Sequence, residues 1–383
     1  MIHFRVIKQS RRSRARLGTL ETPHGAVETP ALVAVATQGV IKGLLNEGLT
    51  ETKTQIVIAN AFHLHIKPGE HVVAAHGGLH TFARLPVPAM TDSGGWQVFS
   101  LGFGFEQGMG KFISAEHRET PRIKAGAQPQ RIRITERGVF LPSPIDGRKI
   151  FLGPKESIRI QERIGADIMF AFDECTSPLA TKEYVANALK RDQRWAAESL
   201  AARKGCAALF GIVHGSRFRD LRVKSARHIA SLAFDGYGIG GDLGDVANEK
   251  RTMVNILRWT LPHLDSAKPR HLLGIGMLED IPRIISEGVD LFDCTVPTRS
   301  ARHGLAHTSA GKLDLKKAKF LNVRRPLDKK CGCAVCGAHT QSFLAHLVRA
   351  KEIAGITYLT HHNLYFFNSF VEEIREKIRK GLF

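Results

Sequence analysis

Three aspartates stand at the ends of short apolar runs, where a carboxylate could do chemistry. Asp92 ends the run 87–92, Asp173 ends 167–173 and Asp293 ends 289–293. Burying unpaired carboxylates is costly, so these acids indicate a site rather than core filling. Two carboxylates that flank a glycosidic bond can perform a retaining displacement, in which one attacks the anomeric carbon and the other handles the proton of the leaving group. A third could hold the leaving group. For Asp293 alone, capping of the next helix is the alternative.

Basic residues indicate the partner of such a site. Arg299 and Arg302 follow Asp293 in a Pro-containing turn, and guanidinium groups match phosphate oxygens. The chain of 383 residues has 55 Lys+Arg against 36 Asp+Glu, a formal net charge of +19. A charge so far from zero indicates a polyanionic partner, most simply nucleic acid, with a membrane surface as the weaker alternative. The leaving group would then be a nucleobase.

Three of the six cysteines crowd into one short segment, at Cys331, Cys333 and Cys336. This spacing is too tight for a disulfide framework and is typical of thiolates that converge on one metal ion. Free thiols in a loop are the alternative. The other cysteines lie apart, within or next to apolar runs, where a cysteine is by default a small buried hydrophobic side chain: Cys175, Cys206 and Cys294.

Eight short apolar runs would position these residues. They are 31–37, 55–60, 87–92, 167–173, 208–214, 237–241, 271–276 and 289–293. Most lack the alternation of a half-buried strand, and the segments 154–164, 182–202 and 278–287 between them have helical periodicity. This order predicts an α/β protein with a (β/α)8 TIM barrel, and a doubly wound open sheet is the alternative.

The barrel prediction tells where the site should be. Active sites of such barrels lie at the carboxyl ends of the strands. The residues at those ends are Asn60, Asp92, Asp173, His214, Gly240 with Gly241, Gly274 with Gly276, and Asp293. No apolar run is long enough to span a bilayer, and the basic N-terminal segment has no apolar stretch after it, so we expect a cytoplasmic protein without a membrane partner.

Several long motifs, in one order, resemble the tRNA-guanine transglycosylase family, also called queuine tRNA-ribosyltransferases, of the bacterial type. The resemblance extends from about Phe4 to the last helix. The motifs are Thr91–Leu101 (TDSGGWQVFSL), Phe172–Thr176 (FDECT), Gly211–Gly215 (GIVHG), Gly236–Gly241 (GYGIGG), Phe292–Arg302 (FDCTVPTRSAR) and the Cys331–Cys336 cluster.

The resemblance implies an exchange of guanine at the tRNA wobble position for a 7-deazaguanine base, by double displacement through a covalent tRNA intermediate. It makes Asp293 the nucleophile and Asp92 the general acid/base. Asp173 and the amide of Gly241, which follows Gly240, would bind the edge of the base. Trp96 takes the aromatic position that stacks on the base. The residues that would hold the anticodon-loop phosphates are Arg299 and Arg302.

The same resemblance supplies a fourth metal ligand, His362, at the start of the final helix; His361, His339 and His346 are its local competitors. Three thiolates and one imidazole leave no open position, so we expect one structural Zn²⁺ per chain. The expected domains are a catalytic barrel over 1–315, a zinc-binding subdomain over 316–362 and a helix over 363–383 that packs back on the barrel.

The departures from the usual bacterial pattern concern the base pocket. His214 stands where a glutamine amide helps to hold the base, and each nitrogen of a neutral imidazole either donates or accepts. Asp242-Leu243-Gly244 replaces Leu-Ala-Val, which would open space at Gly244 and place the Asp242 carboxylate near the amine of the substituent. These changes favour queuine over its smaller aminomethyl precursor, although Leu243 could refill the space. A longer connector at 104–130 would form a lid, contact tRNA or be disordered.

Other functional classes compete with this interpretation. A non-catalytic partner subunit would be expected to lack the three acids, and a zinc hydrolase would need ligands at the strand ends. A DNA-modifying relative would share the acids and the zinc ligands, and a pure RNA-binding module requires that the acids be inert. The resemblance also implies a homodimer and acceptor tRNAs with G-U-N anticodons, those for Asp, Asn, His and Tyr.

Overall fold

The structure is a computed structural model that describes residues 2–99, 132–177, 180–241 and 250–383. Eight parallel strands form a closed barrel in the order β10-β11-β12-β13-β14-β4-β5-β6, so the predicted (β/α)8 barrel is confirmed and the open sheet is excluded. The barrel strands are β4 (Ala31–Val35), β5 (Val57–Ala59), β6 (Ala89–Thr91), β10 (Ile168–Phe170), β11 (Ala208–Val213), β12 (Gly236–Ile239), β13 (Arg270–Leu272) and β14 (Leu291–Cys294).

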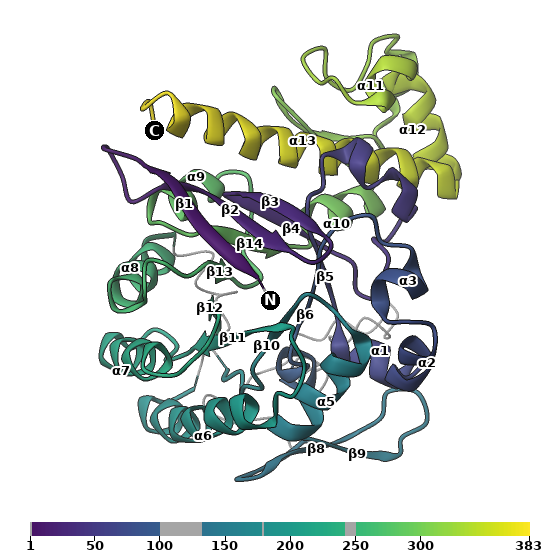
Figure 1. The fold of residues 1–383 in the computed structure, drawn as a ribbon. Helices are drawn as coiled ribbons and strands as arrows, with labels where there is room; N and C mark the ends of the chain where they lie inside the picture. Colours follow the sequence, from purple (N-terminus) through teal and green to yellow (C-terminus); the bar gives the residue numbers. More distant parts are fainter. Residues whose placement is uncertain (1, 100–131, 178–179, 242–249) are drawn as a thin grey trace. The chain divides into compact units, whose positions relative to one another are not determined.

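The chain divides into two compact units, each with its own part of the barrel. The first unit contains Asn60–Phe82 and Met90–Leu273. Its helices α5, α6, α7 and α8 follow one another around the strands, each packed on the next (Figure 1). The helices of this unit are α1 (Ala61–Ile66), α2 (Glu70–Ala75), α5 (Pro154–Ile164), α6 (Lys182–Ala202), α7 (Arg219–Ala230), α8 (Lys250–Thr260) and the 3-10 turn Leu261–His263. An antiparallel sheet is made by β7 (Arg133–Thr135), β8 (Gly138–Pro142) and β9 (Lys149–Leu152).

Local sequence explains where the long helices of this unit begin and end. Pro154 opens α5 and Gly165 closes it with φ +74°, a conformation that costs glycine little. Thr181 caps α6, because its side chain accepts a hydrogen bond from the amide of Tyr184. Inside the barrel, Phe170 of β10 and Phe210 of β11 pack edge to face at 5.6 Å. Both are fully buried, which is worth about 1.5–3 kcal/mol for each side chain.

The second unit contains His3–Ala59, Ala83–Ala89 and Gly274–Phe383. An antiparallel sheet of β1 (His3–Gln9), β2 (Arg16–Thr22) and β3 (Gly25–Thr29) lies beside the long helix α13 (Ile353–Arg379), drawn in yellow in Figure 1. Its other elements are the 3-10 turns Asn46–Gly48, Thr50–Thr52 and Ala318–Asn322, the hairpin β15 (Leu305–Thr308) and β16 (Gly311–Asp314), and the helices α9 (Ile281–Ser286), α10 (Val296–Arg302), α11 (Ala334–Ala338) and α12 (Gln341–Ala350). The short α3 (Leu79–Ala83) ends at the boundary between the units.

Among the described residues, no helix combines the length and the apolar character that a membrane span requires.

A buried ion pair fixes the start of β14 to the N-terminal sheet. Arg16 donates from Nε and Nη2 to the two carboxylate oxygens of Asp290, at 2.7 and 2.6 Å. The two side chains are 4% and 0% exposed. Removal of one partner leaves a buried charge without its counter-charge, so Arg16→Leu should lower the free energy of unfolding by about 3–5 kcal/mol.

Urea denaturation of the two variants measures this effect against a matched control. Arg14→Ala breaks the neighbouring pair with Glu287, which spans 3.6 Å and has a half-exposed arginine, so it should cost at most about 1 kcal/mol. If both variants lost the same free energy of unfolding, burial would not explain the contribution of the Arg16–Asp290 pair.

Candidate active site and metal centre

Asp92 follows β6 directly and lies in a cage of four hydrogen-bond donors. Its Oδ2 accepts from Asn60 Nδ2 at 2.6 Å and from Gln97 Nε2 at 3.1 Å. Its Oδ1 accepts from the backbone amides of Ala61 at 3.1 Å and Gly94 at 3.2 Å. Asn60 also caps α1 with its side-chain oxygen, so the helix start and the carboxylate share one amide group.

The environment of Asp92 raises the pKa of its carboxyl group to near neutral. Burial raises the pKa of Asp92 to about 7, against the backbone hydrogen bonds from Ala61 and Gly94, which lower it; repulsion from Asp173 adds to the rise. A carboxyl group with this pKa can both give and take a proton near neutral pH, which is the requirement for a general acid/base.

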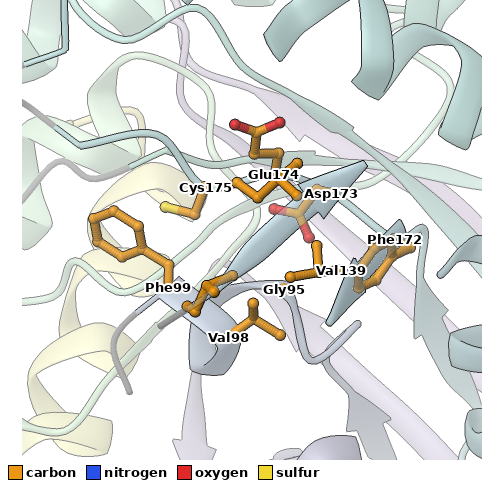
Figure 2. Close-up of a pocket in the computed structure, with 10 residues that line it drawn as sticks. Gly95, Val98, Phe99, Val139, Phe172, Asp173, Glu174 and Cys175 are labelled. Atoms are coloured by element: carbon orange, nitrogen blue, oxygen red, sulfur yellow. The ribbon is translucent and has the colours of Figure 1, made fainter. Parts of the chain in front are cut away.

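Asp173 lies three residues after the end of β10 and is held on both of its oxygens. Ser93 donates its hydroxyl to Oδ1 at 2.5 Å, and His214 Nε2 lies 3.0 Å from Oδ2. Gly95 packs directly against this group, because a Cβ atom there would lie 2.6 Å from Oδ1. A small pocket beside Asp173 is lined mainly by apolar side chains: Val98, Phe99, Ile132, Ile134, Val139 and Phe172. Figure 2 shows the Asp173 carboxylate among the pocket residues and that of Glu174 pointing away from them.

His214 follows β11 and is buried between charged groups. Burial lowers its pKa, but attraction to Asp192 of α6 and the hydrogen bond to Asp173 outweigh burial, and the pKa of His214 is raised. Burial also raises the pKa of Asp192 to about 7, while attraction to His214 lowers it. Asp192 accepts a hydrogen bond from the amide of Glu174 at 2.7 Å. Asp192 is not among the site residues predicted from the sequence. A charged residue on the buried face of α6 is the signal that could have identified it.

The turn after β12 is held by a buried arginine, which sequence reasoning also missed. Arg222 of α7 donates to the carbonyl groups of Ser216, Val213 and Gly240, at 2.7, 3.1 and 2.8 Å. Burial lowers the pKa of Arg222 to about 9. Gly241 has φ +100°, and a Cβ atom there would lie 3.0 Å from Arg222 Nη2. A side chain at position 241 would therefore be strained and crowded by Arg222, which explains the glycine there.

Trp96 is 46% exposed, one of the few large hydrophobic side chains on the described surface. Its ring centroid lies 5.5 Å from that of Phe99, at an interplanar angle of 38°. The indole therefore packs against an aromatic ring and keeps nearly half of its surface exposed among the described residues, as a stacking platform would.

Asp293 belongs to the second unit and lies in β14, one residue before its end. The backbone amide of Gly274, which has φ +77°, donates to Asp293 Oδ1 at 3.0 Å. The next residue, Cys294, donates its thiol to the carbonyl oxygen of Gly276 at 3.0 Å, and burial raises its pKa to about 12. Cys294 thus remains a thiol and holds the loop.

Arg299 and Arg302 occupy the last turn of α10. Arg299 is exposed and Arg302 is partly buried, and within the described part of the chain neither forms an ion pair with a carboxylate. Burial lowers the pKa of Arg302, and repulsion from Arg299 lowers it further. Two neighbouring guanidinium groups that the described residues leave without a carboxylate partner suit phosphate oxygens.

The predicted metal ligands come together in the second unit. His362 Nδ1 lies 3.7 Å from Cys331 Sγ and 3.4 Å from both Cys333 Sγ and Cys336 Sγ. Tetrahedral zinc with Zn–S and Zn–N bonds near 2.3 and 2.0 Å separates its ligand atoms by about 3.5 Å, so the donor set fits this ion. His362 Nε2 lies 2.8 Å from the carbonyl oxygen of His307, which leaves Nδ1 as the ligand atom.

The final helix differs from the expectation in one respect. We expected His362 at its start, but α13 begins at Ile353, so His362 lies well inside the helix. The helix begins earlier because its apolar residues, such as Leu359, pack into the core of the metal-binding region together with Leu344 and Phe320.

Two predicted features lie outside the described residues. They are the segment with Asp242, Leu243 and Gly244, and the connector at 104–130.

Comparison with known proteins adds the family context. Residues 10–383 match the family model described as queuine tRNA-ribosyltransferase. A putative queuine tRNA-ribosyltransferase of Archaeoglobus fulgidus is 43% identical, with 97% of this chain and 94% of the relative covered. The queuine tRNA-ribosyltransferase of Halothermothrix orenii is 40% identical, with 99% and 94% covered. That of Hydrogenovibrio crunogenus is 39% identical, with 98% and 93% covered.

Proposed function

Because this chain belongs to the queuine tRNA-ribosyltransferase family, we propose that it exchanges guanine at the wobble position of tRNAs with G-U-N anticodons for a 7-deazaguanine base. Family membership makes the chain a pentosyltransferase. The observation that carries the proposed mechanism is Asp92, a carboxyl group at a barrel strand end with four donors and a pKa of about 7.

The proposed reaction has two displacements at C1′ of the ribose. In the first, the carboxylate of Asp293 attacks C1′, the bond to guanine N9 breaks with its electron pair on the base, and Asp92 gives a proton to the departing guanine. In the second, Asp92 takes a proton from the incoming base, whose nitrogen attacks C1′ and releases the Asp293 carboxylate. The amide of Gly274 holds Asp293 Oδ1 in both steps.

The remaining residues bind the two substrates. Asp173 accepts from the donor edge of the base, the amide of Gly241 donates to its carbonyl group, and Trp96 stacks on its face, which is worth about 1–3 kcal/mol. The phosphates of the anticodon loop lie against Arg299 and Arg302. The incoming base is queuine rather than its aminomethyl precursor, for which the sequence Asp242-Leu243-Gly244 is the support.

The metal-binding residues complete the proposal. Cys331, Cys333, Cys336 and His362 would hold one Zn²⁺, and with three thiolates and one imidazole as ligands the bound ion would supply structure rather than a place for a substrate. A cytoplasmic homodimer, in which one subunit acts on a tRNA and the other supports it, belongs to the same proposal.

Release of radiolabelled guanine from the wobble position tests the function. The tRNA carries the label at that position, and queuine or the aminomethyl precursor is added as the incoming base. A tRNA without a G-U-N anticodon and a DNA duplex are the controls. Release with queuine from the matching tRNA alone is the expected result; release from the duplex would move the assignment to DNA modification.

The pKa of Asp92 predicts the pH dependence of the first displacement. Protonated Asp92 is the form that donates, and its fraction falls as pH rises through about 7. Guanine release in a single turnover should therefore slow above this pH. Asp92→Asn keeps the shape but has no proton to exchange, so it should be about 10²–10⁴-fold slower and should lose this dependence. Quenched-flow measurement of labelled guanine gives both results; an unchanged profile in Asp92→Asn would exclude Asp92 as the acid.

A further inference from the structure

The imidazole of His214 presents its two nitrogens to different partners. Nε2 lies 3.0 Å from Asp173 Oδ2. The opposite edge of the ring lies against the Gly240–Gly241 turn. A Cβ atom added to Gly240 would lie 3.3 Å from His214 Cε1, and one added to Gly241 would lie 3.7 Å from His214 Nδ1. The backbone of His214 is fixed by the hydroxyl of Ser225, which accepts from its amide at 3.0 Å. The ring thus bridges the acceptor of the proposed base edge and the turn that binds the base carbonyl.

Hydrogen-bond chemistry determines what each nitrogen can do. A carboxylate only accepts, so Nε2 must carry the hydrogen that Asp173 receives. If the imidazole is neutral, Nδ1 is a bare lone pair and repels a carbonyl oxygen beside Gly241. If the imidazole is protonated, Nδ1 carries a hydrogen and binds that oxygen. The protonation of one buried side chain therefore decides whether this part of the pocket accepts or rejects a carbonyl group.

A neighbouring arginine offers an independent indication. Arg222 Nη2 also faces Gly241, at 3.0 Å from the place of its Cβ atom, and has no hydrogen-bond acceptor within the described residues. His214 Nδ1 lies 3.7 Å from the same place, so a carbonyl oxygen beside Gly241 could accept from both side chains.

The charges that face His214 come from three elements. Asp173 follows β10, Asp192 comes from α6, and Arg222 comes from α7. The two carboxylates favour the imidazolium, whereas burial and the positive charge of Arg222 oppose it. One step farther out, Asp92 acts on Asp173 and Glu174 acts on Asp192, both by repulsion. The carboxylates prevail, so the pKa of His214 is raised.

We propose that His214 recognises the nucleobase as an imidazolium, with Nε2–H on Asp173 and Nδ1–H on the base carbonyl beside the Gly241 amide. The proposal rests on the proposed function and deepens it, because it assigns the selection of 6-oxopurines over 6-aminopurines to the proton on this side chain. Asp192 does not touch the base and acts as a positioning residue that keeps the proton on His214. A glutamine at position 214 would supply a donor at every pH, whereas this chain has a donor that can be removed.

Steady-state exchange of labelled guanine into tRNA tests the proposal through KM. For the wild type, KM for guanine should be constant at low pH and should rise about tenfold per pH unit once His214 loses its proton, at a pH above the ordinary histidine pKa of 6.5. His214→Gln should remove this rise. Asp192→Asn should move it to lower pH, which a purely structural role would not do. His76→Gln, on an exposed histidine of the same unit, is the matched control and should keep the wild-type profile.

A second measurement separates this proposal from the proposed function. Titration of ¹⁵N-histidine-labelled protein by NMR, with His214→Gln to assign the signal, reports the protonation of both ring nitrogens without any turnover. The proposal is supported, even if no base exchange is found, if the imidazolium persists up to neutral pH in the wild type and loses its proton at a lower pH in Asp192→Asn. A neutral ring at pH 6, or a KM profile in His214→Gln equal to that of the wild type, overturns it even if exchange is fast.

Discussion

Replacement of Asp293 by Asn should lower the rate of guanine exchange by about 10⁴-fold or more, the largest loss that any single change in this chain should cause. The amide has the shape of the carboxylate and keeps an oxygen for the amide of Gly274, but it is a poor nucleophile toward C1′. The loss should appear in kcat with little change in the affinity for tRNA, because Asp293 forms its bond only in the reaction.

The covalent intermediate gives the sharpest measurement. Wild-type protein mixed with tRNA in the absence of an incoming base should show a tRNA adduct on a denaturing gel, and Asp293→Asn should show none. Asp314→Asn is the matched control: its carboxylate lies in the same unit, partly buried and paired with Lys316 at 4.0 Å, and its loss should leave the adduct intact. An adduct in Asp293→Asn would place the nucleophile elsewhere.

Loss of one metal ligand should cause the largest change in stability. Cys336→Ser removes a thiolate from a set whose binding of Zn²⁺ is coupled to folding, and such sites contribute on the order of 10 kcal/mol in small zinc domains. The metal-binding region has a modest core of its own, with Leu344, Leu359 and Phe320 around the ligands. We therefore expect the region to unfold at a lower temperature and the zinc content to fall from one ion per chain to a trace.

Elemental analysis and thermal unfolding, with and without a chelator, measure the two effects together. Cys206→Ser is the control, because Cys206 lies outside the cluster and is exposed, contrary to the buried position expected from the sequence, and the change should affect neither quantity. If the wild type keeps its melting temperature after complete removal of zinc, the metal is not structural. If Cys336→Ser retains a full complement of zinc, the ligand set is different.

The barrel could be predicted because its strands are buried on both faces and therefore form continuous apolar runs. Each of the eight runs overlaps a barrel strand, and the helices α5 and α6 begin and end as predicted. The strands are shorter than the runs, because burial continues past the hydrogen-bonded ladder. Phe172 is an example: it lies beyond the end of β10 and is buried against Trp195 of α6, at 5.2 Å between ring centroids. Strand β1 was missed because almost all of its residues are exposed, which leaves no buried pattern to detect.

The site could be predicted only where a residue stands at a strand end or in a long motif. Asp92, Asp173 and His214 were predicted in this way, and the structure adds that Ser93 and His214 both contact the Asp173 carboxylate. Asp192 and Arg222 were missed because their partners are distant in sequence and their helices look amphipathic as a whole. Both are charged residues on buried helix faces. Burial of an unpaired charge is costly, so such a residue indicates a polar or charged partner in the interior.

The side chain of Asn60 contributes both to the stability of the fold and to the rate of the proposed reaction. Its oxygen accepts from the amide of His63 at the start of α1, and its nitrogen donates to Asp92. Serine, threonine and aspartate cap helices about as well as asparagine, yet none of them offers an amide donor for Asp92. Selection for stability would tolerate serine at position 60, because the helix cap is kept, whereas selection for turnover would reject it. Aspartate would fail both, because it would place a second buried carboxylate against Asp92. Stability thus accepts more than one amino acid at position 60, and the proposed reaction requires asparagine.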